Sequence, residues 1–139
     1  MPDDFTIDNL QGILDSIELI EIRFAGIAKS DDFVMNANGV LTLDSICMRL
    51  QIIGEILKKI NKIDPMIWGK YPQIEWPKIM KLRDIISHHY HHVDHEIIYD
   101  ICQSNLPALK KVVQQMAKDH AAFYRNLIKI LPVPNNYIL

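Results

Sequence analysis

Apolar side chains recur at steps of three and four residues along most of this chain, and this spacing constrains the fold more than any other feature. Side chains spaced in this way lie on one face of an α-helix, so each run predicts an amphipathic helix. The first run, residues 7–28, contains Ile7, Leu10, Leu14, Ile17, Ile20, Phe24 and Ile27. The second, residues 42–63, contains Leu43, Ile46, Cys47, Leu50, Ile53, Leu57 and Ile60.

Capping signals set the expected ends of these two helices. Asp8 and Gln11 have the spacing of a capping box and predict the start of the first helix, which should fade at residues 29–32. Thr42 is the expected N-cap of the second helix. Gly54 interrupts the second run, and a glycine is tolerable there if another helix comes close. The linker between the helices is polar and contains Asn36, Asn38 and Gly39.

The second half of the chain predicts shorter helices. Asp64-Pro65 should end the second helix, because proline disfavours helical geometry in the residue before it. Residues 64–76 form a loop that Trp68, Tyr71 and Trp76 should anchor to the core. Pro77 suits the first turn of a third helix and Asp94 the N-cap of a fourth, while Asn105-Leu106-Pro107 should kink or break the chain before the last helix. The expected apolar stripes are Ile79, Leu82 and Ile86; Ile97, Ile98, Ile101 and Cys102; and Leu109, Val112, Val113, Met116, Phe123, Leu127 and Ile130.

No segment has the pattern of a paired strand, so we predict an all-α protein, an antiparallel bundle of four to five helices. The length of 139 residues fits one domain, residues 1–139, in which 131–139 form a frayed tail. A slim bundle leaves apolar surface uncovered, and pairing of two copies is a common way to bury it. We therefore expect a homodimer.

Charge and cysteine content limit the partners and the compartment. The formal net charge of −2 excludes a protein that coats nucleic acid by bulk charge, although a local basic site is compatible with it. No apolar run approaches the length that spans a bilayer, so no membrane is expected. Cys47 and Cys102 lie among apolar neighbours, which is typical of reduced core thiols and indicates a cytoplasmic protein.

The segment from Leu82 to Tyr90 contains the motif Arg83-x4-His88-x-Tyr90. With the flanking segments 50–55, 74–79, 93–99 and 106–109, in this order, it resembles the HepT-like toxins of the HEPN group. These toxins are encoded beside a minimal nucleotidyltransferase antitoxin. The resemblance covers roughly residues 5–118, and Asp84 stands where the wider group often has Asn.

The resemblance implies metal-independent cleavage of RNA, with Arg83 and His88 as the catalytic residues. Histidine suits proton transfer because its ordinary pKa lies near neutral pH, and arginine suits a crowded phosphate because its planar fork pairs two oxygens. On an ideal helix, however, a separation of five residues places the two side chains about 140° apart. They converge only if the helix unwinds near His88 or if a second subunit completes the site. A dimer would also supply two histidines, one as base and one as acid.

Tyr90 lies seven residues after Arg83 and so nearly on the same helix face. The resemblance implies that the nucleotidyltransferase antitoxin attaches AMP to this tyrosine, whose added charge and bulk would repel RNA. Asp84, Ser87 and Lys81 are candidate supporting residues. Lys78, Lys81 and Arg83 flank the motif as an expected basic rim that attracts phosphate, and Lys58, Lys59 and Lys62 could extend it. No cofactor is expected.

Two alternative functions stay open at this level. The first is a catalytically silent HEPN subunit that presents a nucleotide or a partner to a nucleotidyltransferase. The second is a metal enzyme, because His88 and His92, like His91 and His95, have the i, i+4 spacing of helical metal ligands. No cysteine is near, and the carboxylates are few: Asp84, Asp94 and Glu96. We therefore expect no functional metal.

Overall fold

The computed structural model describes residues 2–130, and every regular element in that range is helical. The α-helices are α1 (Pro2–Phe24), α2 (Ala37–Ile63), α3 (Trp76–His89), α4 (His95–Asp100) and α5 (Leu106–Ile130). Short 3₁₀ turns lie at η1 (Ser30–Phe33), η2 (Ile67–Lys70) and η3 (Tyr90–His92), and a π-helical turn, η4 (Ile101–Asn105), joins α4 to α5. The predicted all-α bundle is confirmed.

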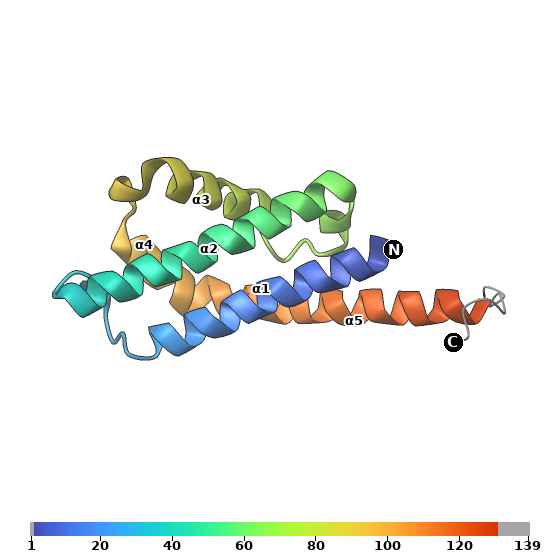
Figure 1. Ribbon diagram of the computed structural model, residues 1–139, viewed down its shortest axis with the longest axis horizontal. Helices are drawn as coiled ribbons and strands as arrows, with labels where there is room; N and C mark the ends of the chain where they lie inside the picture. The colour runs from blue at the N-terminus through green and yellow to red at the C-terminus, as the bar shows by residue number, and fades with distance from the viewer. Residues whose placement is uncertain (1, 131–139) are drawn as a thin grey trace, which may run out of the picture.

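The long helices run antiparallel, with α2 between α1 and α3, and with α5 packed against α1 (Figure 1). The stripes predicted from the spacing supply most of the core, although Ile13 and Phe33 are also fully buried and were not expected. The spacing also predicts Phe123 in the core, and this is wrong, because its side chain is 59% exposed. The C-terminal half of α5 extends past the ends of α2 and α3 (Figure 1). These two helices therefore do not cover it.

The first helix begins and ends earlier than its sequence signals suggest. It starts at Pro2, and the expected capping box lies inside it, where Gln11 donates a hydrogen bond to Asp15 instead of closing a helix start. It ends at Phe24 because the Asp32 carboxylate accepts the backbone N–H groups of Ala28 and Lys29, at 2.8 and 3.1 Å, and so stabilises a separate turn.

The second helix begins within the predicted linker. Its N-cap is Asn36, whose side-chain oxygen accepts the N–H of Gly39 at 2.8 Å, so the assignment of Thr42 as N-cap is wrong. Gly39 is required by space, because a Cβ there would lie 2.0 Å from the Asp32 carbonyl oxygen. Thr42 lies inside the helix and donates to the Asn38 carbonyl.

The later boundaries follow the sequence signals. Asp64 ends α2, Pro77 lies in the first turn of α3, and Asp94 caps α4 by accepting the N–H of Glu96. Before Pro107 the chain changes to a π-helical turn instead of breaking, which accommodates a residue without a backbone N–H. The frayed tail predicted for 131–139 lies outside the described residues.

Candidate active site

Helix α3 carries the motif, and its N-terminal end is fixed by aromatic packing. Trp76 is buried, donates its indole N–H to the Tyr71 carbonyl at 2.8 Å and packs on Trp68 with ring centroids 4.6 Å apart. The predicted anchoring of the 64–76 loop is therefore confirmed, and the start of α3 is held at a defined place beside α2.

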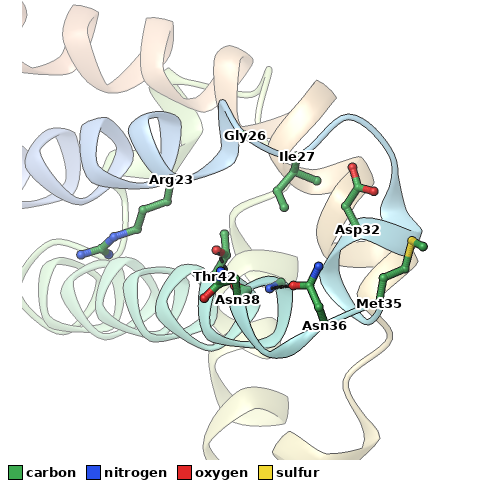
Figure 2. A pocket seen from close by; sticks show the side chains of 9 residues that line it. Arg23, Gly26, Ile27, Asp32, Met35, Asn36, Asn38 and Thr42 are labelled. Carbon is green, nitrogen blue, oxygen red and sulfur yellow. Dashed lines mark hydrogen bonds between the residues drawn. The ribbon is translucent and has the colours of Figure 1, made fainter.

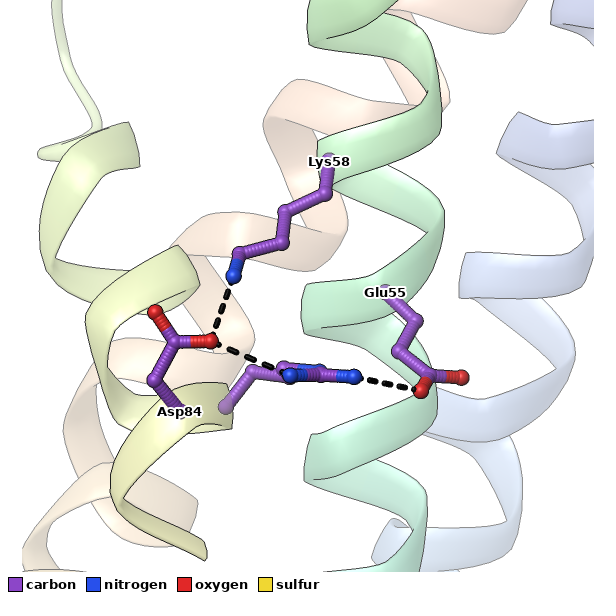
Figure 3. A network of polar contacts seen from close by, with 4 residues as sticks. Glu55, Lys58 and Asp84 are labelled. Carbon is purple, nitrogen blue, oxygen red and sulfur yellow. Dashed lines mark hydrogen bonds and ion pairs between the residues drawn. The ribbon is translucent and has the colours of Figure 1, made fainter. Parts of the chain in front are cut away.

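Arg83 is held between two carboxylates at the α2–α3 contact. Its Nη2 lies 2.9 Å from Glu55 Oε1 on α2, and its Nη1 lies 3.1 Å from Asp84 Oδ1 on α3. Asp84 in turn pairs with Lys58 of α2, so four charged groups form one chain of contacts across the two helices (Figure 3). The Arg83 side chain is only 23% exposed.

The charges in this network stabilise one another. The hydrogen bonds that Arg83 donates to Glu55 and then to Asp84 raise its pKa above its already high value. The Lys58 ammonium, followed by the Arg83 guanidinium, lowers the pKa of Asp84. Arg83 and Asp84 are therefore both ionised at neutral pH, and Arg83 presents a permanent, ordered positive charge.

The approach of the two helices at this point depends on Gly54. A Cβ at Gly54 would lie 2.3 Å from Arg83 Cβ and 2.9 Å from Arg83 Cγ, distances that no packed side chain tolerates. The expectation that another helix comes close to this glycine is confirmed. The stem of Arg83 crosses α2 at Gly54, and its guanidinium reaches the next residue of α2, Glu55.

His88 is in a different environment from Arg83. It is exposed in the last turn of α3, which stays α-helical to His89, so unwinding near His88, one of the two conditions for convergence, is not met within the helix. The helix changes to a 3₁₀ turn only from Tyr90. Arg83 and His88 thus keep the separation of about 140° that a regular helix dictates, and one protomer does not bring them together.

Tyr90 contacts α2 as Arg83 does, which agrees with their spacing of seven residues. Its hydroxyl donates to the Asp44 carboxylate, and the Cys47 thiol lies beside it. Burial, followed by the bond to Asp44, raises the pKa of the Tyr90 phenol, while burial raises the pKa of Cys47 to about 12. The phenol therefore stays protonated at neutral pH, and the side chain is still 39% exposed.

Comparison with known proteins identifies the family. The sequence model described as ribonuclease HepT-like matches residues 13–116, which include α2, α3 and α4 entire. The chain belongs to the HepT-like ribonuclease family. A Methanocaldococcus jannaschii protein named as a candidate RNase is 31% identical over 115 residues, 83% of this chain and 86% of the relative. The "Probable ribonuclease HepT" of Thermococcus cleftensis is 29% identical, over 80% of this chain and 94% of the relative. No solved structure gives a significant match.

The other residues predicted for the site of this HepT-like protein differ in whether they contact Arg83. Asp84 contacts Arg83, whereas Lys81 is exposed on α3. Ser87 lies one helical turn after Arg83, and its buried Oγ has no hydrogen-bond partner among the described residues. Of the expected basic rim, Lys58 is engaged by Asp84 and Lys78 pairs with Glu75 at 2.6 Å.

Sequence reasoning missed Glu55 and Asp44, the two α2 carboxylates that hold Arg83 and Tyr90. In the sequence, Glu55 stands out only as the last residue of the flanking segment 50–55 that resembles the family. The available signal was its position directly after Gly54, the residue that lets α3 approach. Asp44 has no such neighbour, and its pairing with a residue 46 positions away is decided by the packing of the helices.

Two hollows on the HepT-like surface are alternative candidate sites. The first lies between the end of α1 and the start of α2 and has a volume of about 470 Å³ (Figure 2). Arg23 points away from the polar side chains there, and Asn36 and Asp32 already bond to backbone N–H groups. Those polar groups shape the connection between the helices and do not converge on a ligand.

The second hollow is an apolar groove of about 640 Å³, which we call the α3 groove. Leu82 and Ile85 of α3 line it together with Ile97 of α4, Ile101 of η4 and Leu109 of α5. Ile85 and Ile97 are 38% and 53% exposed. His88 follows Ile85 by three residues, so it extends the same face of α3 beyond the groove.

The histidines of the motif region do not assemble a metal site in the described part of the chain. Within residues 2–130, no three His, Cys, Asp or Glu side chains are grouped so as to hold a metal ion. His91 and His92 pack on each other, with ring centroids 4.1 Å apart. None of the helices in that range has both the length and the apolar composition needed to cross a membrane.

Proposed function

We propose that this protein is a metal-independent RNA endonuclease that works as a homodimer, with Arg83 and His88 as its catalytic residues. The observation that carries the proposal is the difference between the environments of these two side chains, which lie on one helix within the residues that match the family. Arg83 is an ordered cation, and His88 is a solvent-exposed acid–base group. RNA cleavage needs both kinds of group.

In the proposed reaction, the 2′-hydroxyl of a ribose attacks the adjacent phosphorus. His88 of one subunit removes the hydroxyl proton as the O–P bond forms, and Arg83 stabilises the charge that accumulates on the phosphate oxygens. The bond from phosphorus to the 5′-oxygen then breaks. His88 of the second subunit supplies the proton that the leaving oxygen takes up, so protons and charge balance without a metal ion.

The α3 groove is the surface proposed for pairing of two copies. Its exposed Ile85 and Ile97 are apolar, and burying them against a symmetric partner would favour association. Because His88 continues the face of Ile85, a two-fold contact there would place two His88 side chains at a shared cleft. Sedimentation should show a dimer at micromolar concentration, and a purely monomeric species would contradict this part of the proposal.

The test of the activity is cleavage of an RNA oligonucleotide in the presence of a chelator. We expect cleavage by the wild type, and a loss of at least about 10²-fold in Arg83→Ala and in His88→Ala. A requirement for a divalent metal would contradict the proposed chemistry. Full activity in both variants would also contradict it, and a wild type that binds RNA without cleaving it would favour the silent subunit.

We further propose that the protein is the toxin of a toxin–antitoxin pair and that its nucleotidyltransferase partner transfers AMP to Tyr90. The phenol oxygen would attack the α-phosphate of ATP, pyrophosphate would leave, and the phenol proton would pass to solvent. The exposed fraction of Tyr90 supports this choice. Intact-mass spectra after incubation with the antitoxin and ATP should gain AMP masses in the wild type and not in Tyr90→Phe. Equal labelling of both would contradict the assignment.

A further inference from the structure

The geometry points to Glu55 of α2 as a positioning residue for Arg83: it sets the orientation in which the guanidinium meets a phosphate. This inference rests on the ribonuclease function proposed above and names a residue outside the Arg-x4-His-x-Tyr motif. Glu55 would act through Arg83 and need not touch the RNA.

The first support is the way in which α2 receives the Arg83 side chain. The absence of a side chain at Gly54 lets the stem of Arg83 lie directly on α2, within a space that a single Cβ would fill. The next residue, Glu55, then accepts from Nη2 at 2.9 Å. Two consecutive residues of α2 thus define the path of the stem and the place of the head group.

The second support is that the guanidinium is held at both of its terminal nitrogens. Glu55 binds Nη2, Asp84 binds Nη1, and Lys58 fixes Asp84 (Figure 3). With both ends held, rotation of the guanidinium about its Nε–Cζ bond is blocked. Each terminal nitrogen carries two hydrogens, so each keeps one N–H that can donate to a phosphate oxygen. Ordering a group before the substrate arrives lowers the cost of ordering it in the transition state.

The charges predict a distinctive kinetic result when Glu55 is neutralised. Lys58 already balances Asp84, so Glu55 is the carboxylate that balances Arg83. The variant Glu55→Gln would leave the site one unit more positive, which favours RNA binding, while it releases one end of the guanidinium. A residue that matters only for folding would not separate these two effects.

The kinetic test measures kcat and KM for an RNA oligonucleotide. We expect Glu55→Gln to lower kcat about tenfold without raising KM. The matched control is Glu21→Gln, because Glu21 makes a similar ion pair between two helices, 2.8 Å from Lys110, with 44% exposure against 43% for Glu55. This control should keep the wild-type kcat. In an Arg83→Ala background, Glu55→Gln should cause no further loss, since it acts through the missing side chain.

A second measurement follows the order of Arg83 without using activity. Nitrogen-edited NMR of the guanidinium groups should show slow rotation for Arg83 and fast rotation for the exposed Arg125. Glu55→Gln should speed the rotation of Arg83, and Glu21→Gln should not.

The inference is overturned if Glu55→Gln keeps the wild-type kcat, if it adds a loss to Arg83→Ala, or if Arg83 rotates as freely as Arg125 in a wild type that cleaves RNA. A wild type that cleaves no RNA overturns the proposed function instead, whatever the spectra show.

Discussion

The middle and the C-terminal end of α3 place their candidate catalytic side chains in opposite environments. In the middle of the helix, Arg83 is largely covered and bonded to Glu55 and Asp84. One and a half turns later, His88 is exposed at the end of the same helix. The difference teaches that the charge-stabilising half of the proposed site is built within one protomer, whereas the proton-transferring half is left open at the surface.

The proposed site is divided because the two side chains lie on different faces of α3. Arg83 points to α2, while His88 continues the face of the α3 groove. An ordered cation needs neighbours that hold it, and these come from α2. A proton-transfer group must reach the RNA and, in the proposed dimer, face its copy across the cleft. The predictions below test this division from the largest expected effect to the smallest.

The largest effect concerns mixed dimers of wild type and His88→Ala. If both His88 side chains serve one shared site, a dimer with a single His88 is inactive. Equal mixing with free subunit exchange should then leave about a quarter of the wild-type cleavage rate, the share of pure wild-type dimers. The measurement is the initial rate after mixing, compared with that of wild type alone at the same total subunit concentration. A value of about half would indicate independent sites and would contradict the shared cleft.

The next effect is on stability at the Arg83 end. Gly54→Ala places a Cβ into the Arg83 stem and should destabilise the protein by about 1–3 kcal/mol, even after the better helix propensity of alanine. Thermal unfolding should show Tm lower by several degrees. The matched control is Gly12→Ala in α1, where the new Cβ meets only the flexible end of Ile56 at 3.2 Å. A Gly54→Ala variant as stable as this control would contradict the close contact.

A smaller loss is expected at the histidine end. Tyr90→Phe removes the hydrogen bond to Asp44 and should cost about 0.5 kcal/mol, the low end for one bond, because the phenol is 39% exposed. Replacement of the exposed His88 by alanine should change stability by less than about 0.5 kcal/mol. Denaturant unfolding of the two variants would measure both changes. A larger loss for His88→Ala than for Tyr90→Phe would reverse the comparison.

The smallest effect is a pH dependence at the Arg83 end. Lys58 and Arg83 lower the pKa of Asp84 below its ordinary value of 3.8 in the folded protein. The contribution of Asp84 to stability is therefore complete above its unfolded pKa and is lost as the pH falls through the lower folded pKa. Below about pH 4, the Tm of the wild type should fall more steeply with pH than that of Asp84→Asn. Parallel curves would contradict the ion pairs.

Much of the fold was predictable because helix signals are local. Apolar spacing gave the stripes of α1, α2 and α3, while Pro77, Asp94 and Asp64-Pro65 marked ends that the structure confirms. The errors at the helix ends occurred where a second polar side chain, only three or four residues from the backbone groups it binds, replaced the expected cap. Asp32 takes the N–H groups that end α1, and Asn36 caps α2 ahead of Thr42. Phe123 has the right spacing for the core, but the other helices stop short of covering it.

The sequence by itself determined that the chain forms long amphipathic helices, that Arg83, His88 and Tyr90 lie in one helical segment, and that Arg83 and His88 diverge on it. These follow from the fixed turn angle of a helix, which needs no partner to define it. Only the tertiary structure decided that Glu55 and Lys58 order the Arg83 network and that Asp44 binds Tyr90. Those contacts join residues 26 to 46 positions apart, and they depend on how closely α3 settles on α2 at Gly54. The distance between the two helices is set by side-chain packing between α2 and α3, which no local sequence pattern predicts.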